Sequence, residues 1–200
     1  AGPLMQSDLG LDNGDLGLVL GAFGIPYAVF QLFGGAIGDK FGPRLTLAVS
    51  AIIVCVATGW IGAAGGLVSL FCARLLLGIG EGAGFPTATR AMSAWTPQGR
   101  WGFAQGITHT FSRVGNTMTA LIIASLIAMF SWRASFFILV PVTLVWAAIW
   151  YWYFRDEPRT HPAMTPEILA KLPVRARGAA KPVIPWLPLA RRIDRNSTRL

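Results

Sequence analysis

Apolar residues dominate five long stretches of the chain, and short polar joints separate these stretches. Each stretch has about 20 residues and few charges, which is the length that an α-helix needs to cross the apolar core of a bilayer. We expect helices over 16–37, 45–64, 67–90, 103–129 and 134–154. The pattern therefore predicts an all-α integral membrane protein whose transmembrane bundle covers residues 1–154.

Residues 155–200 have a different composition, basic and rich in proline. Ten of the seventeen Lys and Arg residues of the chain lie there. We expect one short helix over 166–172, with Thr165 as its N-cap and Pro166 at its first position. The rest of this segment is expected to be mobile linker.

Charges alternate from joint to joint along the chain. The segment before the first helix carries three Asp and no Lys or Arg, whereas the joint at 38–44 carries Lys40 and Arg44. Arg133, between the last two helices, is the exception. Because basic residues at the ends of spans mark the cytoplasmic side, we expect the chain after residue 154 to be cytoplasmic.

The composition excludes several classes of protein. The chain is 54% hydrophobic and 13% charged, with a mean hydropathy of +0.54, whereas soluble domains have about a quarter charged residues. The net charge of +8 comes mainly from the tail, where it suits anionic lipid better than nucleic acid. Neither Cys55 nor Cys72 belongs to a metal or redox motif, and we find no catalytic triad or phosphate-binding loop. We therefore expect no enzyme activity, metal or cofactor.

The two ends of the sequence are abrupt. It begins without Met or a signal peptide, although its first residues are expected outside the membrane. Ile184-Pro185-Trp186 reads like the approach to another span. We expect the chain to be a fragment that lacks a preceding helix.

The joint between the first two helices reads Gly-Ala-Ile-Gly-Asp-Lys-Phe-Gly-Pro-Arg from Gly35 to Arg44. Its glycines allow a tight turn that brings two helix ends together. Asp39 can lie near the N-terminus of a neighbouring helix. Arg44 can pair with Asp39 or with a lipid phosphate. With Gly42, these residues form a candidate conformational motif.

The third expected helix places Arg74 and Glu81 on one face, about 10 Å apart along the axis. Charged side chains within the membrane usually face a polar cavity. Gly78, Gly80 and Gly82 between and beside them leave room for a close helix or a ligand. One interpretation is a buried ion pair that only joins helices. The separation favours the other, in which each group has its own partner or a ligand lies between them.

Two further sets of polar residues lie on expected helices. His109, Arg113 and Asn116 form one stripe, and an arginine there suits an anionic substrate because it donates two hydrogen bonds to a carboxylate. Alternatively, His109 and Arg113 snorkel to the cytoplasmic surface. Tyr27 and Gln31 share a face that lines a cavity or packs at an interface. Arg133 and three tryptophans, Trp146, Trp150 and Trp152, are expected to be interface anchors.

These motifs resemble those of a known family. The Gly35–Arg44 string is similar to the G-x-L-A-D-R-x-G-R-R signature of the major facilitator superfamily, with Pro43 in place of a basic residue. Arg74-x-x-x-Gly78 resembles its fourth-helix motif. The run from Arg74 through Glu81 to Phe-Pro is similar to the anion:cation symporter family, which carries organic acids such as sugar acids.

The resemblance implies an incomplete N-terminal bundle of that superfamily, covering helices two to six and the start of the central loop. It implies proton-coupled symport of a small organic anion, with Glu81 in proton coupling, Arg74 in the same network and Tyr27 at the cavity. It also implies a missing C-terminal half and a bacterial inner membrane. The alternatives are an exchanger of organic phosphates or drugs in the same superfamily, and a truncated membrane module that does not transport.

Overall fold

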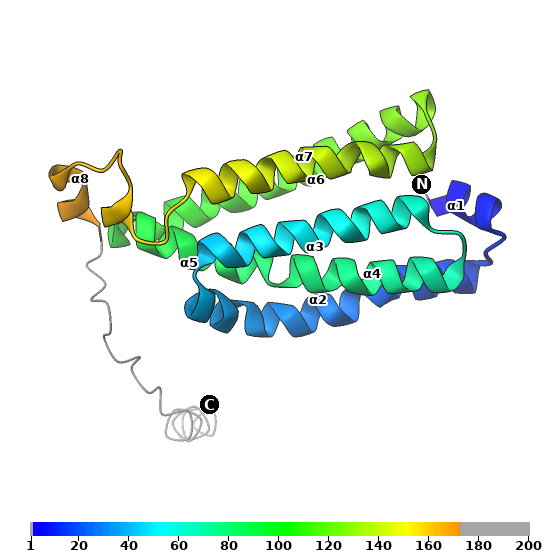
Figure 1. The fold of residues 1–200 in the computed structure, drawn as a ribbon, viewed down its shortest axis with the longest axis horizontal. Coiled ribbons are helices and arrows are strands. Elements are labelled where there is room, and N and C mark those ends of the chain that lie inside the picture. The colour runs from blue at the N-terminus through cyan, green and yellow to red at the C-terminus, as the bar shows by residue number, and fades with distance from the viewer. Residues whose placement is uncertain (1, 173–200) are drawn as a thin grey trace, which may run out of the picture.

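The computed structural model describes residues 2–172, and helices account for nearly all of this part of the chain (Figure 1). The α-helices are α1 (Gly2–Leu9), α2 (Asn13–Phe41), α3 (Pro43–Ala63), α4 (Leu67–Gly82), α5 (Gly84–Trp95), α6 (Trp101–Met129), α7 (Trp132–Tyr153) and α8 (Pro166–Lys171). Two 3-10 turns, η1 (Gln98–Arg100) and η2 (Pro158–Thr160), join them. No strand occurs among the residues described.

Five of these segments are long and apolar enough to cross a membrane, which confirms the expected number of spans. They are α2, α3, the combined α4 and α5, α6 and α7. The first begins at Asn13 rather than at residue 16, because Asp12 caps it. The side chain of Asp12 accepts a hydrogen bond from the backbone N–H of Asp15, and the Asp15 side chain accepts one from the N–H of Asp12. This reciprocal pair is a capping box.

The third span is interrupted where the sequence led us to expect one continuous helix over 67–90. α4 ends at Gly82, Ala83 lies between, and α5 then continues to Trp95. Pro86 explains the break, because it has no N–H to donate to the carbonyl of Gly82 four residues earlier. The span therefore has a local irregularity directly after Glu81.

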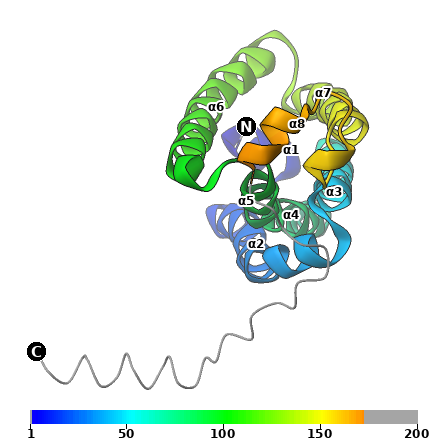
Figure 2. The same ribbon diagram turned by 90° about the vertical axis from the view of Figure 1, so that its left-hand side faces the viewer.

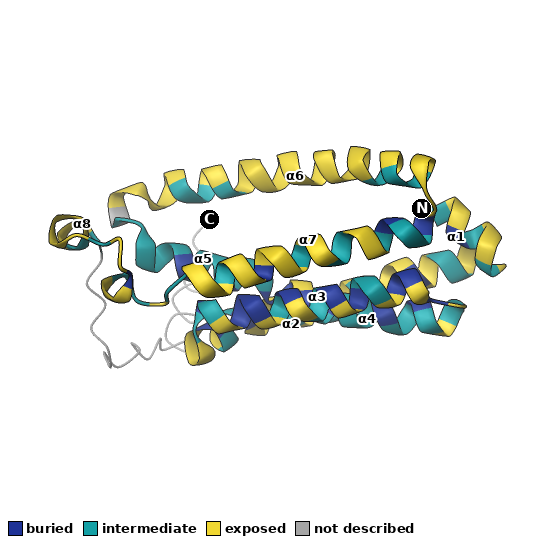
Figure 3. Ribbon diagram, turned by 45° about the horizontal axis from the view of Figure 1, so that its top comes forward, coloured by how far each residue is buried: buried dark blue, intermediate teal, exposed yellow. Residues whose placement is uncertain are grey.

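α4 lies between α2 and α3, and α7 packs along α3 on the side away from α2 (Figures 1 and 2). α6 stands apart from this group. Viewed end-on, it touches its neighbours mainly near α5 and α7 (Figure 2). None of the residues of α6 is buried, and Figure 3 shows it mostly exposed along its length.

Glycines let α4 contact two neighbours closely. A Cβ atom on Gly78 would lie 2.4 Å from a backbone carbonyl oxygen of α2, and one on Gly82 would lie 2.6 Å from another. A Cβ on Gly80 would instead lie 3.0 Å from Ile53 and Val54 of α3. Because residues two apart are about 200° apart round a helix, these alternate glycines face opposite sides. α4 is thus held between α2 and α3 at backbone distance.

The contact with α2 continues into α5. A Cβ on Gly34 would lie 2.8 Å from the Cα of Ala83, and one on Gly38 would lie 3.1 Å from the side chain of Thr87. The Thr87 hydroxyl donates a 3.2 Å hydrogen bond to the carbonyl of Gly34. We call the contact made by Gly34, Gly38, Gly78 and Gly82 the glycine seam.

The end of the bundle at α1 is closed by an apolar cluster and by Arg133. The buried members of the cluster are Met5, Val19, Ile61, Ala64, Leu70, Ala73 and Trp132. The Arg133 guanidinium donates to the Ala64 carbonyl at 2.6 Å and to the Asp8 carboxylate at 3.0 Å, and it lies over the Trp132 ring. Arg133 therefore caps the C-terminus of α3 and holds α1, rather than acting only as an interface anchor.

The chain after α7 folds back on the opposite end. His161 is buried, with its ring against those of Trp95 and Tyr153. This segment is therefore anchored at His161, where we expected mobile linker. The hydroxyl of Thr165 accepts a hydrogen bond from Ile168, which confirms the predicted N-cap of α8. The Ile184-Pro185-Trp186 motif lies outside the described residues.

The glycine seam leads to a first prediction. We expect Gly78→Ala to lower the free energy of unfolding by about 1–3 kcal/mol, because its methyl group would overlap the backbone of α2. The measurement is thermal unfolding of the purified protein in detergent. Gly84→Ala is the matched control, since nothing lies within 4 Å of its Cβ position. Equal stability of the two variants would contradict the seam.

Candidate functional site

Arg74 and Glu81 both lie on α4, inside a membrane-spanning segment. Seven residues are about 20° short of two full turns, so the two side chains leave the helix in nearly the same direction. Arg74 is half-buried, and its Nε atom has no hydrogen-bond partner among the described residues. Glu81 is exposed. The two side chains form no ion pair with each other within this part of the chain, so both remain available to a ligand.

The packing of α4 decides where this pair points. Gly78 and Gly82 face α2, and Gly80 faces α3. At about 100° per residue, Arg74 and Glu81 lie on the flank of α4 between these two contacts. The glycines therefore bring the backbone of α4 close to those of α2 and α3. The charged face of α4 points toward neither of these two helices but to a third side.

The third side is the one on which α6 lies, as one ring contact shows. Phe85 follows Glu81 by one turn and shares its face, and its ring lies 5.0 Å from the ring of His109 on α6. His109 shares a face with Arg113 and Asn116, which follow it by one and about two turns. From this contact we infer that the charged face of α4 and the polar stripe of α6 are turned toward each other.

The same contact sets the register between the two helices. α4 and α5 run toward the end of the bundle at which α6 begins, so α6 runs back antiparallel to them (Figure 1). Glu81 precedes Phe85 by four residues and Arg113 follows His109 by four residues. Both are therefore displaced in the same direction, by about 6 Å along the axis. We therefore expect Arg113 at the level of Glu81, and Arg74 about 10 Å further on.

Two members of the polar stripe on α6 have no protein partner among the described residues. Arg113 and Asn116 are exposed, and their side chains make no hydrogen bond or ion pair with any residue in the described range. Nearer the start of α6, Gln105 donates to the Thr89 hydroxyl at 3.2 Å. Thr108 donates to the sulfur of Met92 at 3.1 Å. Within the described part of the chain, these side-chain contacts between α6 and α5 thus lie at and before His109, and they do not reach Arg113 or Asn116.

Tyr27 and Gln31 on α2 lie beside this arrangement without joining it. The ring of Tyr27 stacks on Phe23 at 5.2 Å, and its backbone carbonyl contacts Gly82, the neighbour of Glu81. Gln31 is exposed and makes no hydrogen bond with another described residue. The structure therefore places Tyr27 next to the site by its backbone and does not bring Gln31 to it.

The residues of the Gly35–Arg44 joint find partners that the sequence did not reveal. Asp39 forms an ion pair with Arg90 of α5 at 2.5 Å. Arg44 does not pair with Asp39. Its Nε atom donates to the Tyr151 carbonyl at 2.8 Å and its guanidinium lies over the Tyr151 ring. The joint therefore fastens α2 to α5 and α3 to α7.

Asp156, which follows α7, also contacts this joint, and sequence reasoning missed it. Its carboxylate accepts a 2.7 Å hydrogen bond from the backbone N–H of Arg44, in the first turn of α3, where a negative charge is favoured. Gly42 has a φ of 84°, and a Cβ there would lie 2.5 Å from Asp156. Gly35 has open space around it, so the close approach is made by Gly34 and Gly38 instead.

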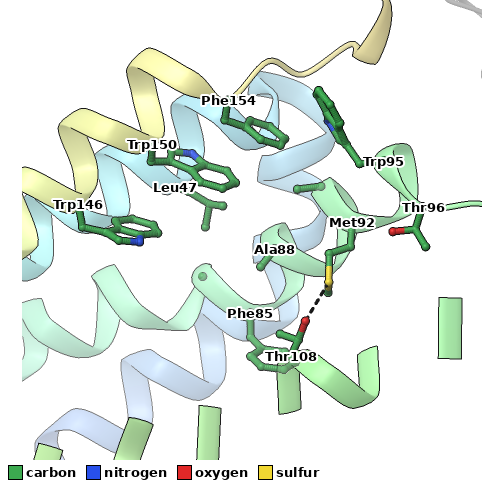
Figure 4. Close-up of a pocket in the computed structure, with 12 residues that line it drawn as sticks. Leu47, Phe85, Ala88, Met92, Trp95, Thr96, Thr108, Trp146, Trp150 and Phe154 are labelled. Atoms are coloured by element: carbon green, nitrogen blue, oxygen red, sulfur yellow. Dashed lines mark hydrogen bonds between the residues drawn. The ribbon is translucent and has the colours of Figure 1, made fainter. Parts of the chain in front are cut away.

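An apolar pocket of about 450 Å³ is lined mainly by α5, α6 and α7 (Figure 4). Phe85 and Met92 of α5, Thr108 of α6 and the stacked Trp146 and Trp150 of α7 line it. These two tryptophans, expected at the interface, line the pocket, although Trp146 is 50% exposed, and Trp152 is exposed as well. None of the predicted site residues lines the pocket. No group of His, Cys, Asp or Glu within residues 2–172 is placed to hold a metal.

Comparison with known proteins places the chain among membrane transporters. The family model described as Major Facilitator Superfamily matches residues 1–193. The chain is 43% identical over 196 residues to the probable sulfoacetate transporter of Cupriavidus necator, covering 96% of this chain and 46% of that protein. It is 31% identical over 171 residues to the hexuronate transporter of Bacillus subtilis, covering 86% of this chain and 40% of that protein.

A third relative is the D-galactonate transporter of Escherichia coli O6:H1. The chain is 30% identical to it over 147 residues, which cover 74% of this chain and 34% of that protein. The chain thus spans less than half the length of each of these three relatives.

The opposed faces of α4 and α6 give a second prediction. In a background with Cys55 and Cys72 replaced by Ala, we expect Glu81→Cys and Arg113→Cys to be joined by a bifunctional methanethiosulfonate. Peptide mass spectrometry would detect the link. Val114→Cys with Glu81→Cys is the control, because Val114 lies at nearly the same level along α6 as Arg113 but points about 100° away from it round the helix. More efficient linking of the Val114 pair would refute the register derived from Phe85 and His109.

Proposed function

The chain belongs to the major facilitator superfamily, and we propose that it forms part of a secondary transporter that carries a small organic anion across the membrane. The observation that carries this proposal is the pair of opposed polar faces inside the spans, with Arg74 on α4 and Arg113 on α6. A guanidinium without a protein partner in a low-dielectric setting binds an acid group strongly, because it donates two hydrogen bonds to it.

The substrates named for the relatives agree with an anionic substrate. Sulfoacetate, hexuronate and galactonate all carry a carboxylate, and the first also carries a sulfonate. We extend to this chain only what they share, which is a small molecule with an acid group. Asn116 on α6 and Tyr27 on α2 would contribute neutral hydrogen bonds, and Gln31 is the most peripheral of the proposed contacts.

We further propose that transport is coupled to protons through Glu81. Its carboxyl group can change its charge by taking one proton, and it shares a face with Arg74. The other titratable groups facing it are Arg113 and His109 on α6, and Tyr27 lies nearby on α2. A proton taken up by Glu81 offsets one negative charge of the entering anion, which links the two movements.

Alternating access would follow from the rocking of this bundle against the rest of the transporter. The joint of Asp39, Gly42 and Arg44 lies at the end where Asp156 and Arg90 hold it. We place this end, and the basic segment after residue 154, in the cytoplasm of a bacterial cell with the protein in the inner membrane. The support is the distribution of Lys and Arg along the chain.

Replacing the carboxyl group tests the proton role. In membrane vesicles that contain the complete polypeptide, we expect Glu81→Gln to abolish accumulation of an organic acid driven by an inward proton gradient. Exchange of labelled for unlabelled substrate should persist, because exchange needs no net proton movement. The measurement is uptake of labelled sulfoacetate, with and without the gradient.

Glu167→Gln is the matched control, since it makes the same chemical change at an exposed position of α8. It should transport like the parent. Gradient-driven accumulation by Glu81→Gln at the level of the parent would remove Glu81 from the coupling. Exchange without any effect of the gradient in the parent itself would point to an exchanger.

A further inference from the structure

The opposed faces of α4 and α6 carry more positive than negative charge. Arg74 and Arg113 contribute two cations, and Glu81 contributes one carboxylate. None of the three takes part in an ion pair within the described residues. Two other arginines of the bundle do have ion-pair partners, Arg90 in Asp39 and Arg133 in Asp8. The candidate site thus carries one more positive than negative charge.

The two arginines lie at different levels. Arg113 is at the level of Glu81, and Arg74 is about 10 Å further along the axis, on the facing helix. A guanidinium holds a carboxylate or sulfonate by paired hydrogen bonds of about 2.8 Å. Two such pairs on facing helices, with a short carbon chain between the acid groups, span a distance of this order. A single acid group occupies only one of them.

We propose that the substrate is a small dianion with an acid group at each end, one held by Arg113 and the other by Arg74. This inference rests on the proposed transport function and narrows its substrate class. Asn116, about one turn beyond Arg113 on the same face, donates a hydrogen bond to the end that Arg113 holds. Arg113 is then the residue that distinguishes dianions from monoanions.

Charge balance supports the same substrate class. When Glu81 carries its proton, the site presents two positive charges, and a dianion neutralises both. A monoanion leaves one of these two charges without a counter-charge inside the membrane. A dianion that enters with a proton on Glu81 therefore leaves no unpaired charge at the site.

The test compares acids that differ by a single acid group. Sulfoacetate and malonate are the dianions, and methanesulfonate and acetate are their one-group counterparts. The complete polypeptide is reconstituted in proteoliposomes, and each acid competes with labelled sulfoacetate. We expect each dianion to compete at least tenfold more strongly than its counterpart. Equal competition within both pairs would overturn the proposal.

Arg113→Gln then assigns the discrimination to one side chain. We expect the KM for sulfoacetate to rise about 10- to 100-fold, the loss typical of a hydrogen-bonded charge. The affinity for methanesulfonate should change much less, so the ratio within each pair collapses. This ratio is an internal control for poor folding. Arg113→Lys should restore part of the preference, because it keeps the charge.

Arg159→Gln removes the same charge from an exposed position in η2 and should keep the dianion preference. A uniform loss for dianions and monoanions in Arg113→Gln would contradict the proposal, since it would indicate a general field and not a second binding group. If monoanions accumulate as well as dianions in the parent, transport stands and the dianion inference fails. If no acid accumulates, the proposed function itself fails.

Discussion

The close contact between α2 and the α4–α5 span is the constraint on which the rest of the arrangement depends. Within a membrane, helices gain little from hiding apolar side chains from lipid, so tight packing has to hold them together. The glycine seam supplies that packing at backbone distance on one side of α4, and Gly80 supplies it on the other. With two sides occupied, the remaining flank of α4 is the one that carries Arg74 and Glu81.

Arg133 and Asp156, at the ends of the bundle, have a different role, because each has a protein partner. Arg133 neutralises Asp8 and satisfies the last carbonyl groups of α3, whose C-terminus is the negative end of its dipole. At the opposite end, Asp156 accepts from the first turn of α3. Both termini of α3 are thus capped by residues at the termini of α7. α3 and α7 are thus held together at both of their ends, which leaves α6 as the least constrained span.

The partners at the ends of α3 also show where sequence reasoning stops. Hydrophobic periodicity located five spans, and the local rule for N-caps located Thr165, because both signals lie within a few neighbouring residues. Asp156 and Arg44 are 112 residues apart, and Asp8 and Arg133 are 125 apart. No local pattern connects them. Arg133 was visible only as an exception to the alternation of charge, and the structure accounts for it by its pairing with Asp8.

The candidate site, too, could be predicted from the sequence only in part. The seven-residue spacing of Arg74 and Glu81, and the stripe of Arg113 and Asn116, followed from helical geometry alone. The sequence could not tell that these two faces lie on the same side of the bundle, because this depends on the contact of Phe85 with His109. It also placed Gly35 in the close turn, whereas its neighbour Gly34 packs against Ala83. A shift of one residue on a helix changes the direction by about 100°, so only the packed structure decides between them.

The weak attachment of α6 makes one side of the site less constrained than the other. An arginine exposed to lipid near mid-membrane costs about 2.5–3.5 kcal/mol, so the face of α6 with Arg113 has to meet water, protein or a bound anion. α4 is fixed between two helices, whereas α6 joins the bundle by contacts near α5 and α7. A ligand held by Arg74 on one helix and Arg113 on the other would therefore bridge a rigid and a less constrained element. Its binding energy would be available to draw the two together, which is what a substrate has to do in order to favour one conformation of a transporter over another.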